Sequence, residues 1–143
     1  GIDTCGVAPT SMVEKVCDTA DFFLYDLKFV DDALHRRYTG GSNRLVLRNL
    51  QVLSSRGARI FLRMIMLPGI NMDSDAIEST MLWLRTHDID VEQIDLLPYH
   101  RYGMNKYGKL GRPVTYFDVP DEGSLEAVRT QMLRFYPNVT IGG

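Results

Sequence analysis

Residues 22–28 read Phe-Phe-Leu-Tyr-Asp-Leu-Lys, and this stretch decides the class of fold. It is short for a helix, rich in aromatic residues and hydrophobic almost throughout. Strands that are covered on both faces of a parallel sheet have this composition, whereas half-exposed strands alternate between apolar and polar residues. We therefore predict a strand of a parallel sheet here.

Helices are predicted on both sides of this strand. Apolar residues recur at helical spacing over about 10–19, and a short polar helix is expected near 31–38. Ser42 is a candidate N-cap for a further helix, which would stop at Gly57. The strand at 22–28 thus lies between helices, as strands of α/β folds do.

The rest of the chain repeats this alternation, and residues 2–4 read like the end of a preceding strand. The later elements are, in order, a strand at 59–66, a helix capped by Asp73 or Ser74, a strand at 94–98, a helix at about 122–136 and a strand at 139–141. This order implies a parallel sheet with right-handed crossovers, either an open doubly wound sheet or part of a (β/α) barrel. The predicted loop between Tyr99 and Pro120 is long enough to suggest a function.

Length and composition indicate one domain over residues 1–143, since 45% of the residues are hydrophobic. The 16 Lys and Arg residues nearly balance the 18 Asp and Glu residues without a clustered basic face, so nucleic acid and membrane surfaces are not expected as partners. The chain shows neither a membrane-length apolar run nor a signal peptide, so we expect a cytoplasmic protein. Cys5 and Cys17 have no partner motif and predict neither a disulfide nor a self-contained metal site.

Polar side chains gather where the predicted strands end. They are Asp3 and Thr4 at the first strand, Asp26 and Lys28 at the second, Arg63 within the third and His100 just past the fourth. The carboxyl ends of parallel strands surround a common mouth, so these side chains are expected to meet. Their convergence matches the layout of a site for a polar ligand.

Each of these residues also has a structural interpretation. Asp26 and Lys28 share one face of their strand, where they either grip a zwitterionic ligand or form an ion pair. Arg63 suits a bidentate carboxylate, whether in a salt bridge or on a ligand. A lone histidine such as His100 is more often a hydrogen-bonded structural residue than a proton shuttle. The spacings alone therefore do not name the ligand.

Six motifs carry a resemblance to a known family. They are Ile-Asp-Thr-Cys-Gly at 2–6, Tyr-Asp-Leu-Lys at 25–28, Tyr-Thr-Gly-Gly-Ser-Asn at 38–43, Leu-Arg at 62–63, Leu-Pro-Gly-Ile-Asn at 67–71 and Leu-Leu-Pro-Tyr-His at 96–100. In this order they resemble the glycyl-radical-enzyme activating enzymes, such as those of pyruvate formate-lyase, in the radical S-adenosylmethionine (SAM) superfamily. The resemblance continues through Gly103 to Leu110-Gly111 and so covers nearly the whole chain.

The resemblance implies a fold and a reaction. Members of the family have a partial (β/α)6 barrel, in which a [4Fe–4S] cluster binds SAM and cleaves it reductively to a 5′-deoxyadenosyl radical. That radical takes a hydrogen atom from a glycine of the partner, a glycyl radical enzyme. Pyruvate formate-lyase is the first expectation for the partner, and a flavodoxin or ferredoxin is the expected electron donor in an anaerobic metabolism.

The resemblance also assigns roles to individual residues. Asp26, Leu27 and Lys28 match the family's Asp-x-Lys motif, which contacts SAM, and His100 matches a histidine near the bound nucleoside. Arg63 matches an arginine near SAM and the incoming glycyl loop. Three positions, Asp3, Thr4 and Asp26, resemble ligands of a monovalent cation beside SAM, for which oxygen atoms are suitable ligands.

The chain departs from the family pattern in one respect. The C-x3-C-x2-C loop that ligates the cluster is absent, and Cys5 with Cys17 do not replace its three thiolates. We therefore expect a C-terminal half of a longer enzyme that is inactive by itself. Such a half barrel is expected to self-associate through its exposed edge.

Two alternatives remain at the level of sequence. One is a (β/α) barrel lyase or isomerase that uses Asp26, Lys28 and His100 as acid–base groups, with Lys28 as a Schiff-base nucleophile. The other is a stand-alone module that binds a nucleoside or a protein. Neither alternative accounts for the six motifs.

Overall fold

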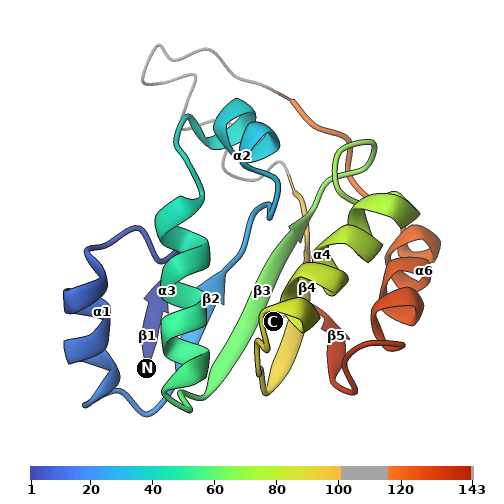
Figure 1. Cartoon of the computed structure of the whole chain (residues 1–143). Helices are drawn as coiled ribbons and strands as arrows, with labels where there is room; N and C mark the ends of the chain where they lie inside the picture. Colours follow the sequence, from blue (N-terminus) through green and yellow to red (C-terminus); the bar gives the residue numbers. More distant parts are fainter. Residues whose placement is uncertain (101–115, 143) are drawn as a thin grey trace.

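The computed structural model describes residues 1–100 and 116–142 as five strands and five helices. The strands are β1 (Ile2–Thr4), β2 (Phe23–Asp26), β3 (Ile60–Met66), β4 (Gln93–Pro98) and β5 (Val139–Ile141). The helices are α1 (Thr10–Cys17), α2 (Asp32–Thr39), α3 (Arg44–Ser55), α4 (Ser74–Thr86) and α6 (Glu122–Met132). They alternate along the chain as the sequence predicts (Figure 1).

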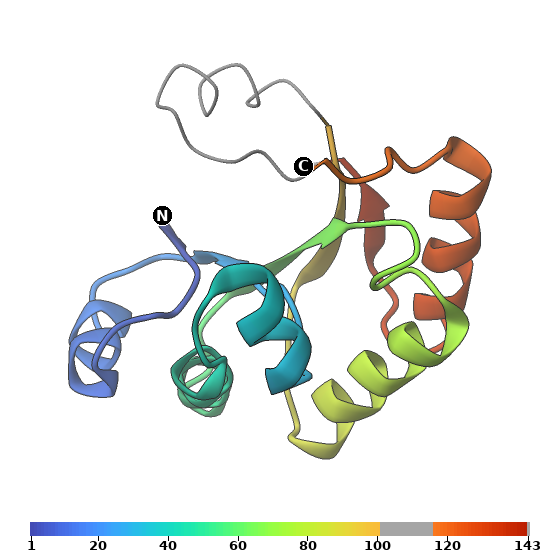
Figure 2. The same ribbon diagram turned by 90° about the horizontal axis from the view of Figure 1, so that it is seen from above.

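The strands form one parallel sheet in the order β1-β2-β3-β4-β5, so each strand pairs with its neighbour in the chain. Figure 2 shows that the described helices all lie along one face of a bent sheet. The predicted partial (β/α) barrel is therefore confirmed, and the open doubly wound sheet, with helices on both faces, is excluded for the described residues. The face without helices corresponds to the inside of the barrel, and we call it the inner face.

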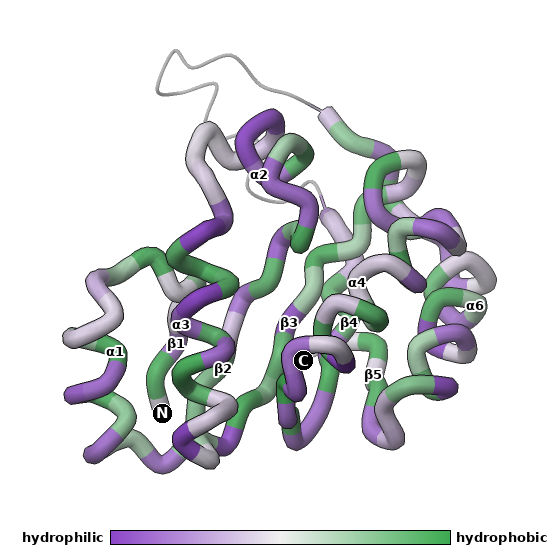
Figure 3. Tube along the Cα trace, viewed as in Figure 1, coloured by the Kyte–Doolittle hydropathy of each residue, from purple (hydrophilic) through white to green (hydrophobic). Residues whose placement is uncertain are grey.

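The core lies between the sheet and the helices. Alternate residues of β2 and β3, such as Tyr25, Leu62 and Met66, are completely buried there, as is Leu27 just after β2, whereas the strand residues between them are half-buried. The strands are coloured largely as hydrophobic in Figure 3 because the inner face also carries apolar residues. Continuous hydrophobicity therefore predicted the parallel sheet correctly, although described helices cover only one of its faces.

Gly6 lets the chain turn closely over the core after β1. Its backbone has φ of 73°, and a Cβ atom there would overlap the Oη atom of Tyr25. The Tyr25 hydroxyl donates to the carbonyl of Val46 at 2.7 Å, and the buried Asn49 donates to the carbonyl of Gly6 at 2.8 Å. The two hydrogen bonds hold the Tyr25 hydroxyl and the turn at residue 6 close to α3. No room remains there for a side chain, which explains the glycine of the Ile-Asp-Thr-Cys-Gly motif.

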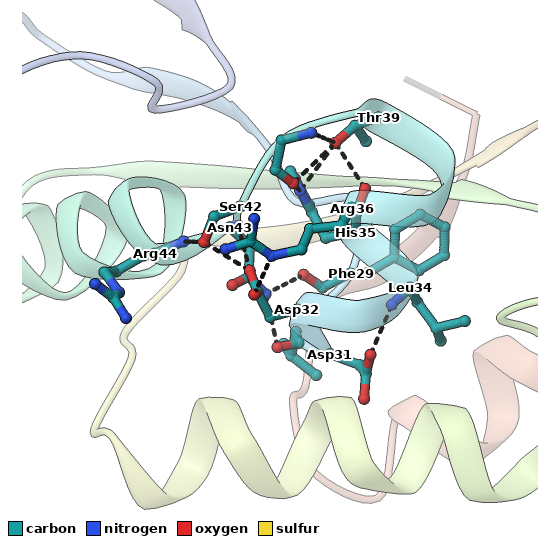
Figure 4. Close-up of polar contacts among 12 residues, drawn as sticks. Phe29, Asp31, Asp32, Leu34, His35, Arg36, Thr39, Ser42, Asn43 and Arg44 are labelled. Atoms are coloured by element: carbon teal, nitrogen blue, oxygen red, sulfur yellow. Dashed lines mark hydrogen bonds and ion pairs between the residues drawn. The ribbon is translucent and has the colours of Figure 1, made fainter.

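The Tyr-Thr-Gly-Gly-Ser-Asn motif forms the turn between α2 and α3 (Figure 4). Asp32 accepts hydrogen bonds from the Ser42 hydroxyl at 2.7 Å, the Asn43 backbone at 2.9 Å and Arg36 Nε at 2.6 Å. The Asn43 amide group donates to the carbonyls of Phe29 and Val30. The predicted N-cap is off by one residue, because Asn43 occupies the N-cap position of α3 without a side-chain cap bond. The Ser42 hydroxyl nevertheless accepts from the backbone N–H of Arg44, the first residue of α3, at 3.2 Å, and it donates to Asp32.

The Leu-Pro-Gly-Ile-Asn motif is a second turn with a structural explanation. Asn71 accepts from the backbone N–H of Leu67 at 2.8 Å and donates to the carbonyl of Ile65 at 2.8 Å. The side chain thereby ends β3 and leads the chain into α4, whose predicted N-cap Asp73 accepts from the Ala76 N–H at 3.0 Å. Both motifs hold the carboxyl ends of β2 and β3 in place.

Candidate functional site

Four charged side chains from three segments meet on the inner face. Asp26 and Arg63 are register partners in β2 and β3, and Asp3 lies on the next strand. Lys28 follows β2 by two residues and so shares the face of Asp26. We call Asp3, Asp26, Lys28 and Arg63 the charged cluster, and it lies at the carboxyl ends of the strands, where the sequence predicts a site.

Hydrogen bonds link the four side chains of the charged cluster into one network. Arg63 donates from Nε to Asp26 Oδ1 at 2.7 Å, and from Nη1 and Nη2 to the two carboxylate oxygens of Asp3 at 3.0 and 2.5 Å. Lys28 Nζ donates to Asp26 Oδ2 at 2.9 Å. Asp26 is therefore paired with two cations, and each of the three guanidinium nitrogens of Arg63 donates one hydrogen bond.

The cluster is neither deeply buried nor fully exposed. The side chains of Arg63, Asp26 and Lys28 are 19%, 24% and 33% exposed, whereas that of Asp3 is 64% exposed. The hydrogen bond to Asp3 and the charge of Asp26 raise the pKa of Arg63 against the opposing effect of burial. Partial exposure means that an incoming polar ligand can reach these groups without first opening the core.

The other predicted site residues lie around the cluster in different settings. The Thr4 hydroxyl accepts from the Gly6 N–H at 3.0 Å, which fixes its position at the end of β1. The Leu27 side chain is fully buried against the helices, so only its backbone faces the site, and its N–H donates to the carbonyl of Arg63. His100 lies exposed two residues after β4. Gly103 and Leu110-Gly111 lie outside the described residues.

A second polar group on the inner face was missed by the sequence analysis. Asp95 of β4 is the register partner of Arg63 and is only 5% exposed. Its Oδ1 atom accepts from Gln93 Nε2 at 2.5 Å and from the Thr140 hydroxyl at 2.6 Å. A carboxylate inside the apolar strand Ile94-Asp95-Leu96-Leu97 is the signal that could have revealed it.

A hollow of about 420 Å³ lies between α2 and α4, on the helix side of the sheet. Its lining is mainly apolar and includes Phe29, Leu34 and Trp83. Lys28 is the one member of the charged cluster that lines it. The hollow thus borders the charged cluster only at Lys28, and the other three members of the cluster do not line it.

The chemistry of the charged cluster suits two ligands. A carboxylate beside an ammonium group can bind the carboxylate and ammonium groups of an amino acid such as the methionyl part of SAM. The carboxylates of Asp3 and Asp26 offer oxygen ligands for a hard cation of low charge, whereas Thr4 pairs in register with the buried Tyr25 and directs its hydroxyl to the other face. The residues present therefore fit SAM and a monovalent cation.

An iron–sulfur cluster does not fit the described residues. Such a cluster requires several thiolates, whereas Cys5 is exposed and Cys17 lies on α1. Among residues 1–100 and 116–142, no three His, Cys, Asp or Glu side chains are arranged as metal ligands. None of the described helices is both long enough and apolar enough to cross a membrane.

Curated proteins similar to this chain are activating enzymes. The chain is 35% identical to the trans-4-hydroxy-L-proline dehydratase activating enzyme of Clostridioides difficile, over 99% of this chain and 48% of that protein. It is 31% identical to the pyruvate formate-lyase 2-activating enzyme of Escherichia coli K12, over 99% of this chain and 49% of that protein. The chain thus spans about half the length of these relatives.

Solved structures agree with these relatives. A domain of a pyruvate-formate lyase-activating enzyme from Bacteroides vulgatus matches with a TM-score of 0.81 and 25% identity, over 99% of this chain and 79% of that one. A radical SAM methyltransferase from Sphaerobacter thermophilus shares the fold, with a TM-score of 0.67, 15% identity and coverage of 98% of this chain and 39% of that one. No family model matches the chain. Sequence and fold place it in the family of glycyl-radical-enzyme activating enzymes, as a homologue of about half of such a protein.

Proposed function

We propose that this chain is the C-terminal half of a radical SAM oxidoreductase that generates a glycyl radical on a partner enzyme. The observation that carries the proposal is the charged cluster on the inner face, in a chain homologous to activating enzymes. Asp26 and Lys28 fit the zwitterionic methionyl group of SAM. A residue such as Leu27, buried on the opposite face, would contribute only backbone contacts.

The chain's own residues bind and orient in this proposal. Lys28 donates to the SAM carboxylate and Asp26 accepts from the ammonium group, because these are the complementary charges. Asp3 and Asp26 hold a monovalent cation through oxygen atoms. His100 lies beside the nucleoside, and Arg63 contacts SAM and the incoming glycyl loop. Bound SAM, with a cluster held by the upstream part of the protein, supplies the one-electron chemistry.

The partner is proposed to be a glycyl radical enzyme, with pyruvate formate-lyase as the first candidate and a flavodoxin or ferredoxin as the electron donor. The relatives' names include activating enzymes for a hydroxyproline dehydratase and, in Oleidesulfovibrio alaskensis, for choline trimethylamine-lyase. Together with pyruvate formate-lyase, these two enzymes form a panel of candidate partners for the test of radical formation. Location in the cytoplasm of an anaerobically growing cell follows from the same proposal.

Glycyl-radical formation tests the proposal. The full-length protein containing this chain would be reconstituted anaerobically with iron and sulfide and mixed with SAM, a reductant and each partner of the panel. We expect the electron paramagnetic resonance (EPR) doublet of a glycyl radical with one partner, and a strong loss with Lys28→Ala. Lys15→Ala, on the exposed side of α1, is the matched control. Wild-type protein that loads a cluster but forms no radical on any member would contradict the proposal.

A further inference from the structure

We propose that Arg63 and an incoming monovalent cation exchange places on Asp3 and Asp26, and that Asp95 receives the displaced guanidinium group. The inference rests on the proposed function, because it takes Asp3 and Asp26 as the cation ligands. It adds Asp95 as a positioning residue, which none of the six motifs singles out.

Arg63 already occupies the carboxylates that the cation needs. Its guanidinium group bonds both oxygens of Asp3 and one oxygen of Asp26. A cation between these carboxylates would face the positive charge of Arg63 within hydrogen-bonding distance of the same oxygens. Like charges this close repel strongly at a partly buried site. Cation binding therefore requires the guanidinium group to leave.

Asp95 lies within reach of the displaced side chain. Arg63 is flanked in register by Asp26 on β2 and by Asp95 on β4, and register partners in a parallel sheet point to the same face. Neighbouring strands are about 4.8 Å apart on either side. Since Arg63 reaches the carboxylate of Asp26 at 2.7 Å, rotation about its side-chain bonds brings the group to the carboxylate on the other strand.

The Asp95 carboxylate is held ready for a donor. Gln93 and Thr140 both bond its Oδ1 atom, which fixes the orientation of the group. Among the described residues, no hydrogen bond to Oδ2 is found, and no buried side-chain nitrogen or oxygen atom lacks a partner, so Oδ2 keeps some contact with solvent. A guanidinium group arriving from Arg63 would therefore find this oxygen open to a donor.

The charge on the inner face supports the same exchange. Within residues 1–100 and 116–142, the carboxylates Asp3, Asp26 and Asp95 together with the cations Lys28 and Arg63 leave one negative charge. A monovalent cation neutralises that charge once Arg63 has moved to Asp95. The cation then lies between Asp3 and Asp26, and Lys28 stays beside Asp26.

Potassium binding to the full chain tests the exchange without enzymatic activity. The ion is titrated against N-methylglucamine at constant ionic strength, and the backbone amide resonances of Thr4 and Asp26 report its occupancy by NMR. Arg63→Gln removes the competitor and is expected to tighten potassium binding by about fivefold or more. Asp95→Asn removes the receiving charge and is expected to weaken binding by a similar factor, with recovery in Asp95→Glu. Asp95→Asn retains both bonds to Oδ1, and Asp90→Asn at the surface is the control.

A double-mutant comparison separates the exchange from simple charge attraction. In the Arg63→Gln background, Asp95→Asn should leave potassium affinity unchanged, because no arginine remains to be received. Equal weakening in both backgrounds would overturn the role of Asp95 and leave the cation site standing. Unchanged or weaker binding in Arg63→Gln would overturn the competition, even if the Asp95 variants fail to fold. If potassium causes no saturable shift of the amide resonances in the wild type or in Arg63→Gln, the exchange and the cation assignment are both overturned. SAM binding is tested separately, by the EPR response of the full-length protein to SAM.

Discussion

At the scale of single residues, Arg63 is the centre of the inner face. It bonds Asp3 and Asp26, which come from two other strands, and Asp95 adjoins it on a third. Among the described residues, the hydrogen bonds of its guanidinium group go to Asp3 and Asp26, whereas Asp95 is bonded by Gln93 and Thr140. The proposed exchange would move the guanidinium group to the carboxylate on its other side.

Gly6→Ala should destabilise the chain strongly. The substitution forces a side chain into the left-handed region at φ of 73° and into the Oη atom of Tyr25. We expect the free energy of unfolding to fall by about 2 to 4 kcal/mol, measured by urea denaturation. Gly41→Ala, with no atom within 4 Å of the added Cβ, is the control and should have a much smaller effect. Equal effects would contradict this account of Gly6.

Asp32 should make stability depend on pH in the acidic range. The hydrogen bond from Ser42, followed by those from Arg36 and the Asn43 backbone, holds the pKa of Asp32 well below its ordinary value. A lowered folded-state pKa stabilises the chain above the unfolded pKa, and this contribution is lost as the pH falls below it.

Asp32→Asn should therefore lower the urea midpoint at neutral pH, and the gap to wild type should narrow toward about pH 3. Asp90→Asn, at an exposed carboxylate outside the network, is the matched control. A gap of constant size between neutral and acidic pH would show that the charge of Asp32 does not act in this way.

The folded chain should lose stability at alkaline pH because of Tyr136. Burial raises its pKa to about 12, and its hydroxyl donates to the carbonyl of Ile89 at 2.8 Å. A raised pKa leaves the contribution intact below the unfolded pKa of about 10 and removes it as the pH rises toward the folded value. Tyr136→Phe should be less stable than wild type at neutral pH, with a difference that shrinks above about pH 10. Urea midpoints across this range provide the measurement.

At the scale of elements, hydrophobic periodicity predicted the strands and helices because it reports burial directly. The residues at which these helices and strands begin and end were predicted less well. The last helix was expected to reach residue 136 but stops at Met132, and turns follow before Pro137, which disfavours helical geometry at Tyr136. Asp26 was placed correctly at the end of its strand and Arg63 within the next one. Their bonds to one another and to Asp3 depend on strand register, which no local pattern contains.

The turn after β3 should depend on Asn71. Its side chain makes two hydrogen bonds to backbone groups of Leu67 and Ile65, and the residue is buried. Asn71→Ala leaves both groups without these partners and should lower the free energy of unfolding by about 2 kcal/mol. Asn138→Ala, which removes one exposed bond to the Glu92 carbonyl, should cost less in the same denaturation experiment. Similar losses would show that the turn does not need Asn71.

At the scale of the whole molecule, the described elements form a bent parallel sheet with helices on its outer face (Figures 1 and 2). The inner face carries the charged cluster. Its homologues are about twice as long as the part that matches. The missing thiolates predict that the 143-residue chain alone neither cleaves SAM nor binds it tightly. Release of 5′-deoxyadenosine by the isolated, reduced chain would contradict this expectation. Concentration-dependent sedimentation tests the expected self-association.

The most direct test of the central claim is the EPR spectrum of the full-length protein, reconstituted anaerobically, reduced and recorded with and without SAM. We predict a [4Fe–4S] signal whose shape changes when SAM is added, and a greatly weakened response to SAM in Asp26→Asn and Lys28→Ala. The Lys15→Ala control should respond like the wild type. A cluster signal that SAM leaves unchanged, or that responds equally in all variants, would contradict the assignment of the inner face as the SAM site.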